Sequence, residues 1–318
     1  MKRFGIVVAT LGLLSACQRP CNNYVDRTYV HKYGLEVDQD EWNARGQGGQ
    51  IITTRKDGVV VTRSYDNSLP HGPTTYTFPH SNLVARTETY ERGKLISETD
   101  HYETGIAKQE IRHSLGGARI VSTWFEDGTP RSQETYQGDV LIAGDYFTTQ
   151  NLLESRVREG AGKRIVRSNS GALQAEENIL EGEKILETTF YASGEPKAIT
   201  AFRGGKVDGT RKTFLPGGLP NTIETWKSGE QDGITTLFAM GEKKAEVPYI
   251  RGKREGVEIR FGADGHRIEE VSWKGDMKHG PDRFYVKGDE AIDWYHEGKR
   301  VRKEAYEKLN PPPLPRHG

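Results

Sequence analysis

The residues of this chain that could carry chemistry are scattered rather than grouped in a catalytic pattern. Of the nine histidines and two cysteines, no histidine lies at close metal-ligand spacing from another histidine or a cysteine. Gly160-Ala-Gly162-Lys163 lacks the spacing and the Ser or Thr of a phosphate-binding loop. Glu269 and Glu270 would point to opposite faces of a strand. The sequence therefore predicts no enzyme, no catalytic residue and no metal site; an active site assembled from distant segments is the alternative.

The N-terminal segment has the layout of a secretory signal. A basic start (residues 1–3) precedes an apolar run (residues 4–14) that falls well short of the about 20 residues a membrane-spanning helix needs. The following Leu-Ser-Ala-Cys, ending at Cys17, resembles the bacterial lipobox. The resemblance implies that residues 1–16 are removed as a lipoprotein signal peptide and that Cys17 carries palmitate-type acyl chains as covalent lipid. An ordinary secretory signal or an uncleaved anchor is the alternative.

Two residues after Cys17 bear on its surroundings. In lipoproteins of double-membraned bacteria the residue after the lipidated Cys matters for sorting, and Gln18 in place of Asp favours the outer membrane. If Cys17 carries lipid, Cys21 has no intrachain partner, so it is either a free thiol or forms an intermolecular disulfide. We therefore expect a cell-envelope location, with membrane contact through the lipid anchor.

The composition favours a thin β structure and argues against some partners. Lys plus Arg and Asp plus Glu are 45 each, and this neutrality argues against nucleic-acid binding, which normally shows a basic footprint. The chain has 37 glycines and only 34% hydrophobic residues, but 9% of it is aromatic. The glycines indicate many turns, and the low hydrophobic content indicates a thin core. The aromatic content is too high for a disordered chain, so we expect the chain to fold.

Turn-type residues recur in two interleaved series with a period of about 23 residues, which indicates a repeat protein with two strands per repeat. The first series is Gly58, Asn82, Gly105, Gly128, Asn151, Gly171, Gly194, Gly218, Gly241, Gly265 and Gly288. The second series is Gly93, Gly116, Gly138, Gly160, Gly182, Gly205, Gly229, Gly252, Gly275 and Gly298. The clearest units read Gly-x3-Gly-x4-aromatic, as from Gly205 through Gly209 to Phe214.

This pattern resembles the bacterial variant of the MORN repeat, a β-hairpin family. The resemblance implies an all-β fold, an elongated antiparallel meander or ribbon of about eleven repeated hairpins, with no globular α/β domain. It is strongest over residues 204–298. Over residues 93–190 the second Gly of the pair is lost, with Ser97 and Leu186 in its place, and bent or irregular packing is expected there.

The chain divides accordingly into four segments. Residues 1–16 are the signal peptide, and residues 17–45 are the lipidated Cys, a tether and an N-terminal cap. Residues 46–300 are the repeat array, and residues 301–318 form a short helix and a Pro-rich tail.

Two regular side-chain series are candidates for binding. Aromatic residues recur once per strand, and they either form the core or make a stripe on which sugar rings could stack. This series includes Tyr90, Tyr136, Phe202, Phe214, Trp226, Phe238, Tyr249, Phe261, Trp273 and Tyr295. Lysines follow glycines of the second turn series, and they are either solvated or contact anionic headgroups. These are Lys94, Lys163, Lys184, Lys206, Lys253 and Lys299.

The function expected from these features is non-enzymatic. A lipid-anchored envelope protein would present an extended β-repeat surface to an envelope protein partner that the sequence does not identify. The alternative is a module that binds glycans, anionic lipid or lipopolysaccharide headgroups. An antitoxin-like role, often attached to bacterial MORN-type proteins, is less expected because of the signal peptide.

Overall fold

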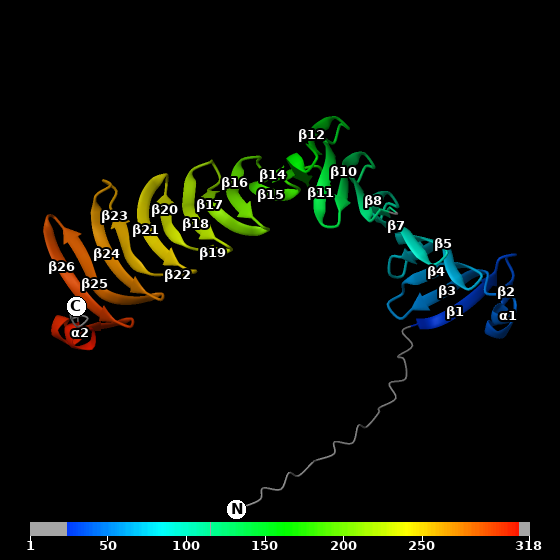
Figure 1. The fold of residues 1–318 in the computed structure, drawn as a ribbon, viewed down its shortest axis with the longest axis horizontal. Coiled ribbons are helices and arrows are strands. Elements are labelled where there is room, and N and C mark those ends of the chain that lie inside the picture. The colour runs from blue at the N-terminus through cyan, green and yellow to red at the C-terminus, as the bar shows by residue number, and fades with distance from the viewer. Residues whose placement is uncertain (1–23, 115, 312–318) are drawn as a thin grey trace, which may run out of the picture. The chain divides into compact units, whose positions relative to one another are not determined.

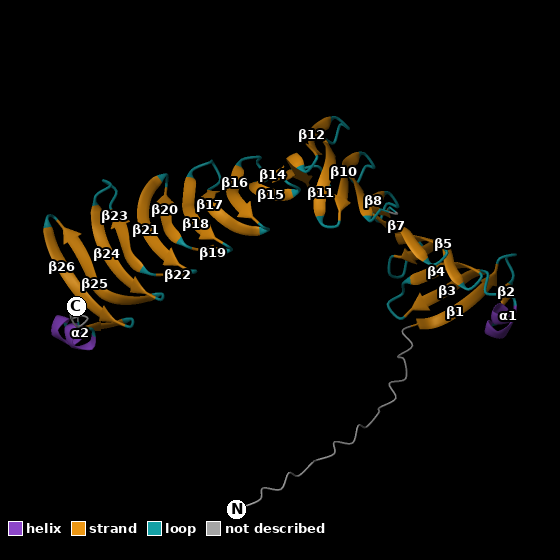
Figure 2. Ribbon diagram, viewed as in Figure 1, coloured by secondary structure: helices purple, strands orange, loops and turns teal. Residues whose placement is uncertain are grey.

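The computed structural model describes residues 24–114 and 116–311. Over these residues the chain is almost entirely antiparallel β, with 27 strands and two short helices (Figure 2), which confirms the predicted all-β hairpin repeat. No helix in this part of the chain is long and apolar enough to span a membrane. Cys17, Gln18, Cys21 and the tail from residue 312 lie outside it.

The described part of the chain divides into two compact units with the boundary between Ile96 and Ser97, and each unit is described by itself. In the first unit β1 pairs with both β2 and β3, and β3 to β6 then pair in chain order. Its elements are β1 (Tyr24–His31), β2 (Glu36–Val37), α1 (Gln39–Ala44), β3 (Gly49–Arg55), β4 (Val60–Asp66), β5 (Leu69–Thr77) and β6 (Val84–Glu91). Strand β7 (Lys94–His101) runs across the boundary between the units.

In the second unit each hairpin also pairs with the next one along the chain, from β7 with β8 to β26 with β27 (Figure 1). Its first strands are β8 (Ala107–His113), β9 (Ala118–Trp124), β10 (Pro130–Gln137), β11 (Val140–Phe147), β12 (Leu153–Arg158), β13 (Ala161–Arg167), β14 (Leu173–Leu180), β15 (Glu183–Phe190) and β16 (Pro196–Arg203). The rest are β17 (Lys206–Phe214), β18 (Pro220–Lys227), β19 (Glu230–Gln231), β20 (Gly233–Ala239), β21 (Glu242–Ile250), β22 (Lys253–Arg254), β23 (Gly256–Phe261), β24 (Arg267–Lys274), β25 (Met277–Val286), β26 (Asp289–His296), β27 (Lys299–Val301) and α2 (Lys303–Leu309).

The two turn series adopt left-handed backbone conformations, which explains their glycines. In the tight turns two consecutive residues have positive φ, as at Ser228 (φ 51) and Gly229 (φ 92), and this is the type I′ geometry that suits a two-residue hairpin. Two of the predicted turn sites are shifted. Positive φ falls on His80 rather than Asn82, and on Gly117 rather than Gly116.

The second glycine of the Gly-x3-Gly pair has a separate role. Gly233 (φ 124) lies opposite Tyr249 in the strand register. A Cβ atom built on Gly233 would lie 2.9 Å from the Cβ of Thr225 on the preceding strand. Glycine is therefore favoured at this position for two reasons: the backbone has a positive φ, and a Cβ atom would crowd the side chain of Thr225.

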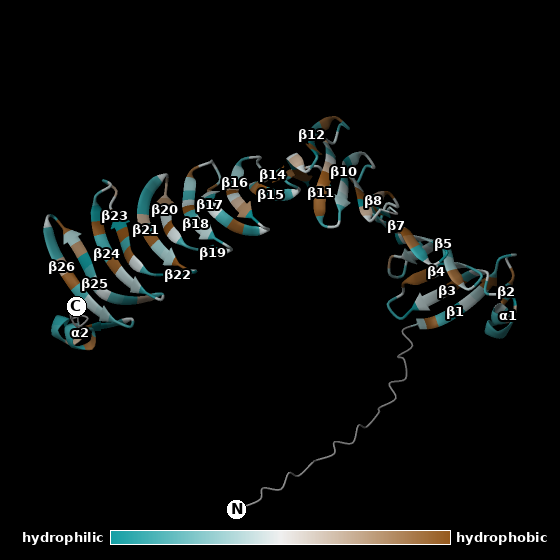
Figure 3. Ribbon diagram, viewed as in Figure 1, coloured by the Kyte–Doolittle hydropathy of each residue, from teal (hydrophilic) through white to brown (hydrophobic). Residues whose placement is uncertain are grey.

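Register defines two faces of the sheet in the second unit. The aromatic face carries Trp226, Tyr249, Trp273 and Tyr295, each directly opposite a glycine of the neighbouring strand. The other, aliphatic face carries the alternate positions, which include Ile199, Ile223, Ile234, Val257 and Ile292. The hydropathy of the strands is accordingly mixed along their length (Figure 3).

Each helix covers part of one end of the array. In the first unit Trp42 of α1 is buried, with its ring 5.7 Å from that of Tyr29 and 6.3 Å from that of Tyr65. Asp38 caps the helix by accepting a hydrogen bond from the Glu41 N–H. Residues 17–45, expected to be a tether and a cap, thus contain the first strand, β1, as well as helix α1.

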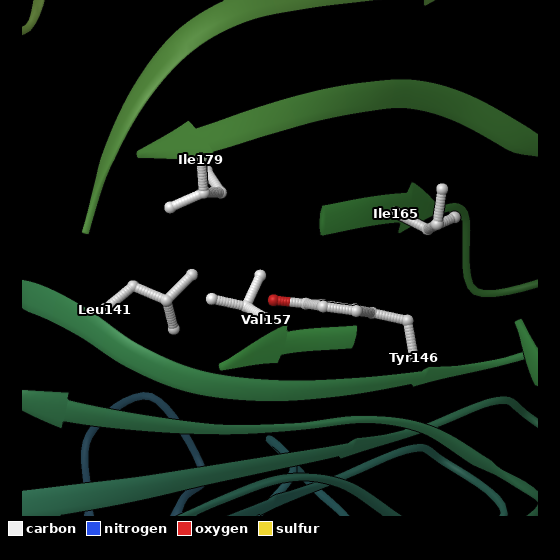
Figure 4. Close-up of a cluster of buried hydrophobic side chains, with 5 residues drawn as sticks. All are labelled: Leu141, Tyr146, Val157, Ile165 and Ile179. Carbon is white, nitrogen blue, oxygen red and sulfur yellow. The ribbon is translucent and has the colours of Figure 1, made fainter. Parts of the chain in front are cut away.

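The largest apolar cluster lies in the segment where the repeat is degenerate. Leu141, Tyr146, Val157, Ile165 and Ile179 are all buried and pack together from strands β11 to β14 (Figure 4). The sheet curls in this segment and brings together groups that are far apart in the sequence. Arg131 Nη1, for example, donates a hydrogen bond to Asn169 Oδ1, 38 residues away, at 3.1 Å. Val157 and Ile179 precede Gly160 and Gly182 by three residues, as Trp226 precedes Gly229, so aliphatic side chains here take the places that rings hold in the regular repeats.

Candidate functional site

The aromatic face of the second unit buries a row of carboxylates. Glu134, Glu177, Glu224 and Glu258 are all buried, and each is hydrogen-bonded to an Arg or Lys. Three of them also accept a hydrogen bond from an aromatic side chain, such as the Trp226 Nε1–H, which donates to Glu224 at 2.8 Å. Sequence reasoning missed this row.

A signal for the row was present in the sequence. Glu-Thr followed by Tyr or Trp occurs at residues 88–90, 134–136 and 224–226, and in each case the ring donates to the Glu two residues earlier. Residues two apart on a strand share a face, so the spacing alone places ring and carboxylate together.

Glu134 is the most connected member of the row. It accepts hydrogen bonds from the hydroxyls of Tyr136 (2.7 Å) and Tyr146 (2.9 Å) and from Arg164 Nε (2.7 Å). Burial by itself raises the pKa of Glu134, but the bonds and the charge of Arg164 outweigh burial, so its pKa lies below the ordinary value. Burial and the Glu134 charge raise the pKa of Tyr136 to about 12.

We expect Glu134 to make stability depend on acid. Because its folded-state pKa is lowered, its contribution is complete above the ordinary carboxyl pKa of 4.5 and is lost as the pH falls through the lower folded value. Glu134→Gln should cost about 2 kcal/mol near pH 7, the range for hydrogen bonds to a charged group. Urea unfolding at a series of pH values between 7 and 3 measures both effects. A variant with the same acid sensitivity as the wild type would contradict this role.

The repeating rings are neither a buried core nor an open platform. All ten aromatics of the predicted series are half-buried. Several are covered by a cation from a neighbouring strand: Arg254 Cζ lies 3.6 Å from the Trp273 ring centroid, and Lys243 Nζ lies 4.2 Å from that of Phe261. Such covered rings contribute cation–π stabilisation and offer little free surface for stacking of a sugar.

The lysine series does not behave as one group. Lys163 Nζ is 2.7 Å from Glu176, and Lys184 Nζ is 2.6 Å from Glu187. The side chains at the other four positions, Lys94, Lys206, Lys253 and Lys299, are exposed. Acidic residues such as Glu230 and Asp276 occupy equivalent places at the intervening turns.

Three histidines lie in small polar contacts. His113 Nε2 is 3.3 Å from Glu98 Oε1. His279 and His296 lie with ring centroids 5.1 Å apart, and Asn310 is hydrogen-bonded to both rings. Within residues 24–114 and 116–311 no three His, Cys, Asp or Glu side chains are grouped so as to hold a metal ion.

A polar cleft of about 380 Å³ opens on the aromatic face over β8, β9, β10 and β13. Four arginines and a single carboxylate line it: Arg119, Arg131, Arg164, Arg167 and Glu134. Sequence reasoning missed this cleft, because it brings together residues from strands that are not neighbours.

The comparisons with known proteins identify no family. No protein-family model matches the chain, and no curated protein matches it. The TcdB2-TccC3-Cdc42 crystal structure matches at 12% identity and TM-score 0.20, over 88% of this chain and 19% of that chain. The TcdB2-TccC3 crystal structure matches at 12% identity and TM-score 0.23, over 86% and 14%. Saccharomyces cerevisiae Sqt1 matches at 8% identity and TM-score 0.16, over 78% and 90%.

The chain spans less than a fifth of the length of the two TcdB2-TccC3 chains that it matches.

Proposed function

We propose that this protein is a non-enzymatic, lipid-anchored protein of the cell envelope that binds another protein through the aliphatic face of its MORN-like repeats. The observation that carries the proposal is the exposure of that face. Ile234 is 49% exposed, Val257 45%, Ile268 44% and Ile292 43%. Apolar side chains exposed at regular intervals across neighbouring strands are typical of an interaction surface.

Helix α2 supports the choice of face. It packs on the aliphatic face of the last hairpin, with the Tyr306 ring 5.0 Å from the Trp294 ring and 5.6 Å from that of His279. Asn310, just after the helix, adds hydrogen bonds to His279 and His296. The chain itself thus uses this face to hold a helical segment, and strands β16 to β24 present more of the same face.

The glycan- or headgroup-binding alternative has less support. Several of the rings that would stack on sugars are covered by cations, and acidic residues interrupt the lysine series at Glu230 and Asp276. The membrane anchor rests on the resemblance at Cys17 alone.

Site-specific charge tests the proposed surface. Ile234→Lys combined with Val257→Lys should abolish in-cell cross-linking of the partner while the chain stays folded, since a charged group in an apolar interface loses its hydration. Thr210→Lys, an exposed position on the same face, is the control for added charge and should still cross-link. Equal cross-linking by the wild type, the double variant and Thr210→Lys would rule out this face. Binding of the purified chain to lipopolysaccharide would favour the headgroup-binding alternative.

The anchor is tested independently. Mass spectrometry should find acyl chains on Cys17 at the N-terminus of the membrane-bound protein, and Cys17→Ser should abolish acylation and leave the precursor uncleaved, with residues 1–16 still attached. A wild-type chain without acylation would remove the lipid from the proposal and leave the interaction surface untouched.

A further inference from the structure

The cleft over β8, β9, β10 and β13 is lined by more arginines than carboxylates. Two of its arginines are neutralised by carboxylates. Arg164 contacts Glu134 at 2.7 Å and Glu177 at 3.0 Å, and Arg167 contacts Glu154 at 2.6 Å. These pairs join strands β10, β12, β13 and β14 across the curl.

The other two arginines, Arg119 and Arg131, have no close carboxylate partner. Arg119 Nη2 lies 3.5 Å from Oδ1 of Asp139, and the Asp139 side chain is fully exposed. Its Nε atom is buried, with no hydrogen-bond partner in the described part of the chain. A buried donor without an acceptor is costly, and a native protein rarely keeps one without reason.

Arg131 is held by neutral acceptors. Its Nε donates to Thr123 Oγ1 at 3.2 Å, and its Nη1 donates to Asn169 Oδ1 at 3.1 Å and to the Arg167 carbonyl at 3.4 Å. These bonds fix the guanidinium in place, but among the described residues no carboxylate pairs with it and its Nη2 makes no hydrogen bond. The bonds therefore orient a cation at the cleft wall.

We propose that this cleft binds a small oxyanion, such as a phosphate or a dicarboxylate, between Arg119 and Arg131. A guanidinium presents N–H donors in a rigid fork that matches the oxygens of a carboxylate or a phosphate. Gln109, Thr123 and Ser132 supply further polar groups to the lining. The cleft volume falls within the usual range for small-ligand sites.

The nearby carboxylates of β7 do not neutralise the two arginines from within the cleft. Glu98 and Asp100 on β7 lie opposite Ile111 and Gln109 in the register, and neither lines the cleft. Glu98 contacts His113, and Asp100 also has a partner. This site is separate from the proposed protein-binding surface, because it opens on the opposite face of the sheet.

Calorimetric titration of the full chain at low salt tests the inference, with inorganic phosphate in one arm and succinate in the other. Saturable binding in either arm is expected, and the arm that binds distinguishes the two kinds of oxyanion. Arg119→Gln and Arg131→Gln should each weaken binding at least tenfold. Arg156→Gln is the control, because Arg156 lies outside the cleft and its partner Asp145 keeps Arg158.

Thermal melts of each variant separate lost binding from lost folding. Arg119→Gln is the decisive variant. Arg119 Cζ lies 4.8 Å from the Tyr136 ring centroid, and loss of this one cation–π contact should lower the melting temperature only slightly. No binding in either arm would overturn the inference. Equal affinity of Arg119→Gln and wild type, or an equal loss in Arg156→Gln, would overturn it as well.

Discussion

Tyr146→Ala is expected to destabilise the curled segment by about 3–5 kcal/mol, the usual cost of deleting a buried aromatic side chain. The Tyr146 side chain is 1% exposed and packs with Leu141, Val157 and Ile179. Its hydroxyl donates to Glu134, so the truncation also takes one donor from a buried carboxylate. Stability of a repeat array is set largely by neighbouring units, so the loss should appear first in strands β10 to β14.

Hydrogen exchange with regional resolution, at increasing urea, measures this effect better than one global transition, because long repeat arrays need not unfold in a single step. Tyr146→Phe keeps the ring and should cost about 2 kcal/mol for the lost hydrogen bond to a charged group. Phe238→Ala is a second reference. Phe238 is half-buried, so about 1 kcal/mol is expected. If Tyr146→Ala were no less stable than Phe238→Ala, the packing account of the curl would be wrong.

Gly162→Ala is expected to cost about 3 kcal/mol, at the upper end of the strain range for an unfavourable backbone conformation. Gly162 has φ 142, and a Cβ atom there would lie 2.2 Å from the carbonyl oxygen of Arg156 and 3.0 Å from the Cα of Val157. Both are backbone atoms, so relief requires strands β12 and β13 to move apart, next to the fully buried Val157.

Gly116→Ala is the matched control for this change. Gly116 does not have a positive φ, and nothing lies within 4 Å of a Cβ atom built on it. Alanine there should leave the urea midpoint unchanged or raise it slightly, because alanine restricts the unfolded chain. Equal destabilisation by both substitutions would show that the glycines act through flexibility rather than through close approach.

The hairpins could be predicted from sequence because their determinants are local. A two-residue turn such as Ser228-Gly229 and the alternating side chains beside it are set by neighbours in the chain. In the structure the second Gly of the Gly-x3-Gly pair lies opposite an aromatic residue, as Gly233 lies opposite Tyr249. The buried carboxylates could have been found by the same logic, from Glu two residues before a ring, as at Glu134 and Glu224.

The curl and its arginine cleft could not be predicted in this way. The contact of Arg164 with Glu134 joins residues 30 apart, and that of Arg131 with Asn169 joins residues 38 apart. No period of the sequence relates these pairs, since they meet only when several hairpins bend together. The loss of the second Gly at Leu186 marked irregular repeats, but it did not show which side chains would close on one another.

The tight turns carry a consequence for how such a chain can change in length. The N–H of Gly229 donates to the carbonyl of Val207 at 2.8 Å, that of Gly252 to Gln231 at 2.8 Å, and that of Gly298 to Lys278 at 2.9 Å. Each bond reaches back to the previous hairpin, so one inserted residue would misplace the donor and exchange the two faces of the strand. Gain or loss of an entire hairpin preserves every bond and both faces. Duplication and deletion of whole hairpins are therefore the changes in length that this architecture tolerates.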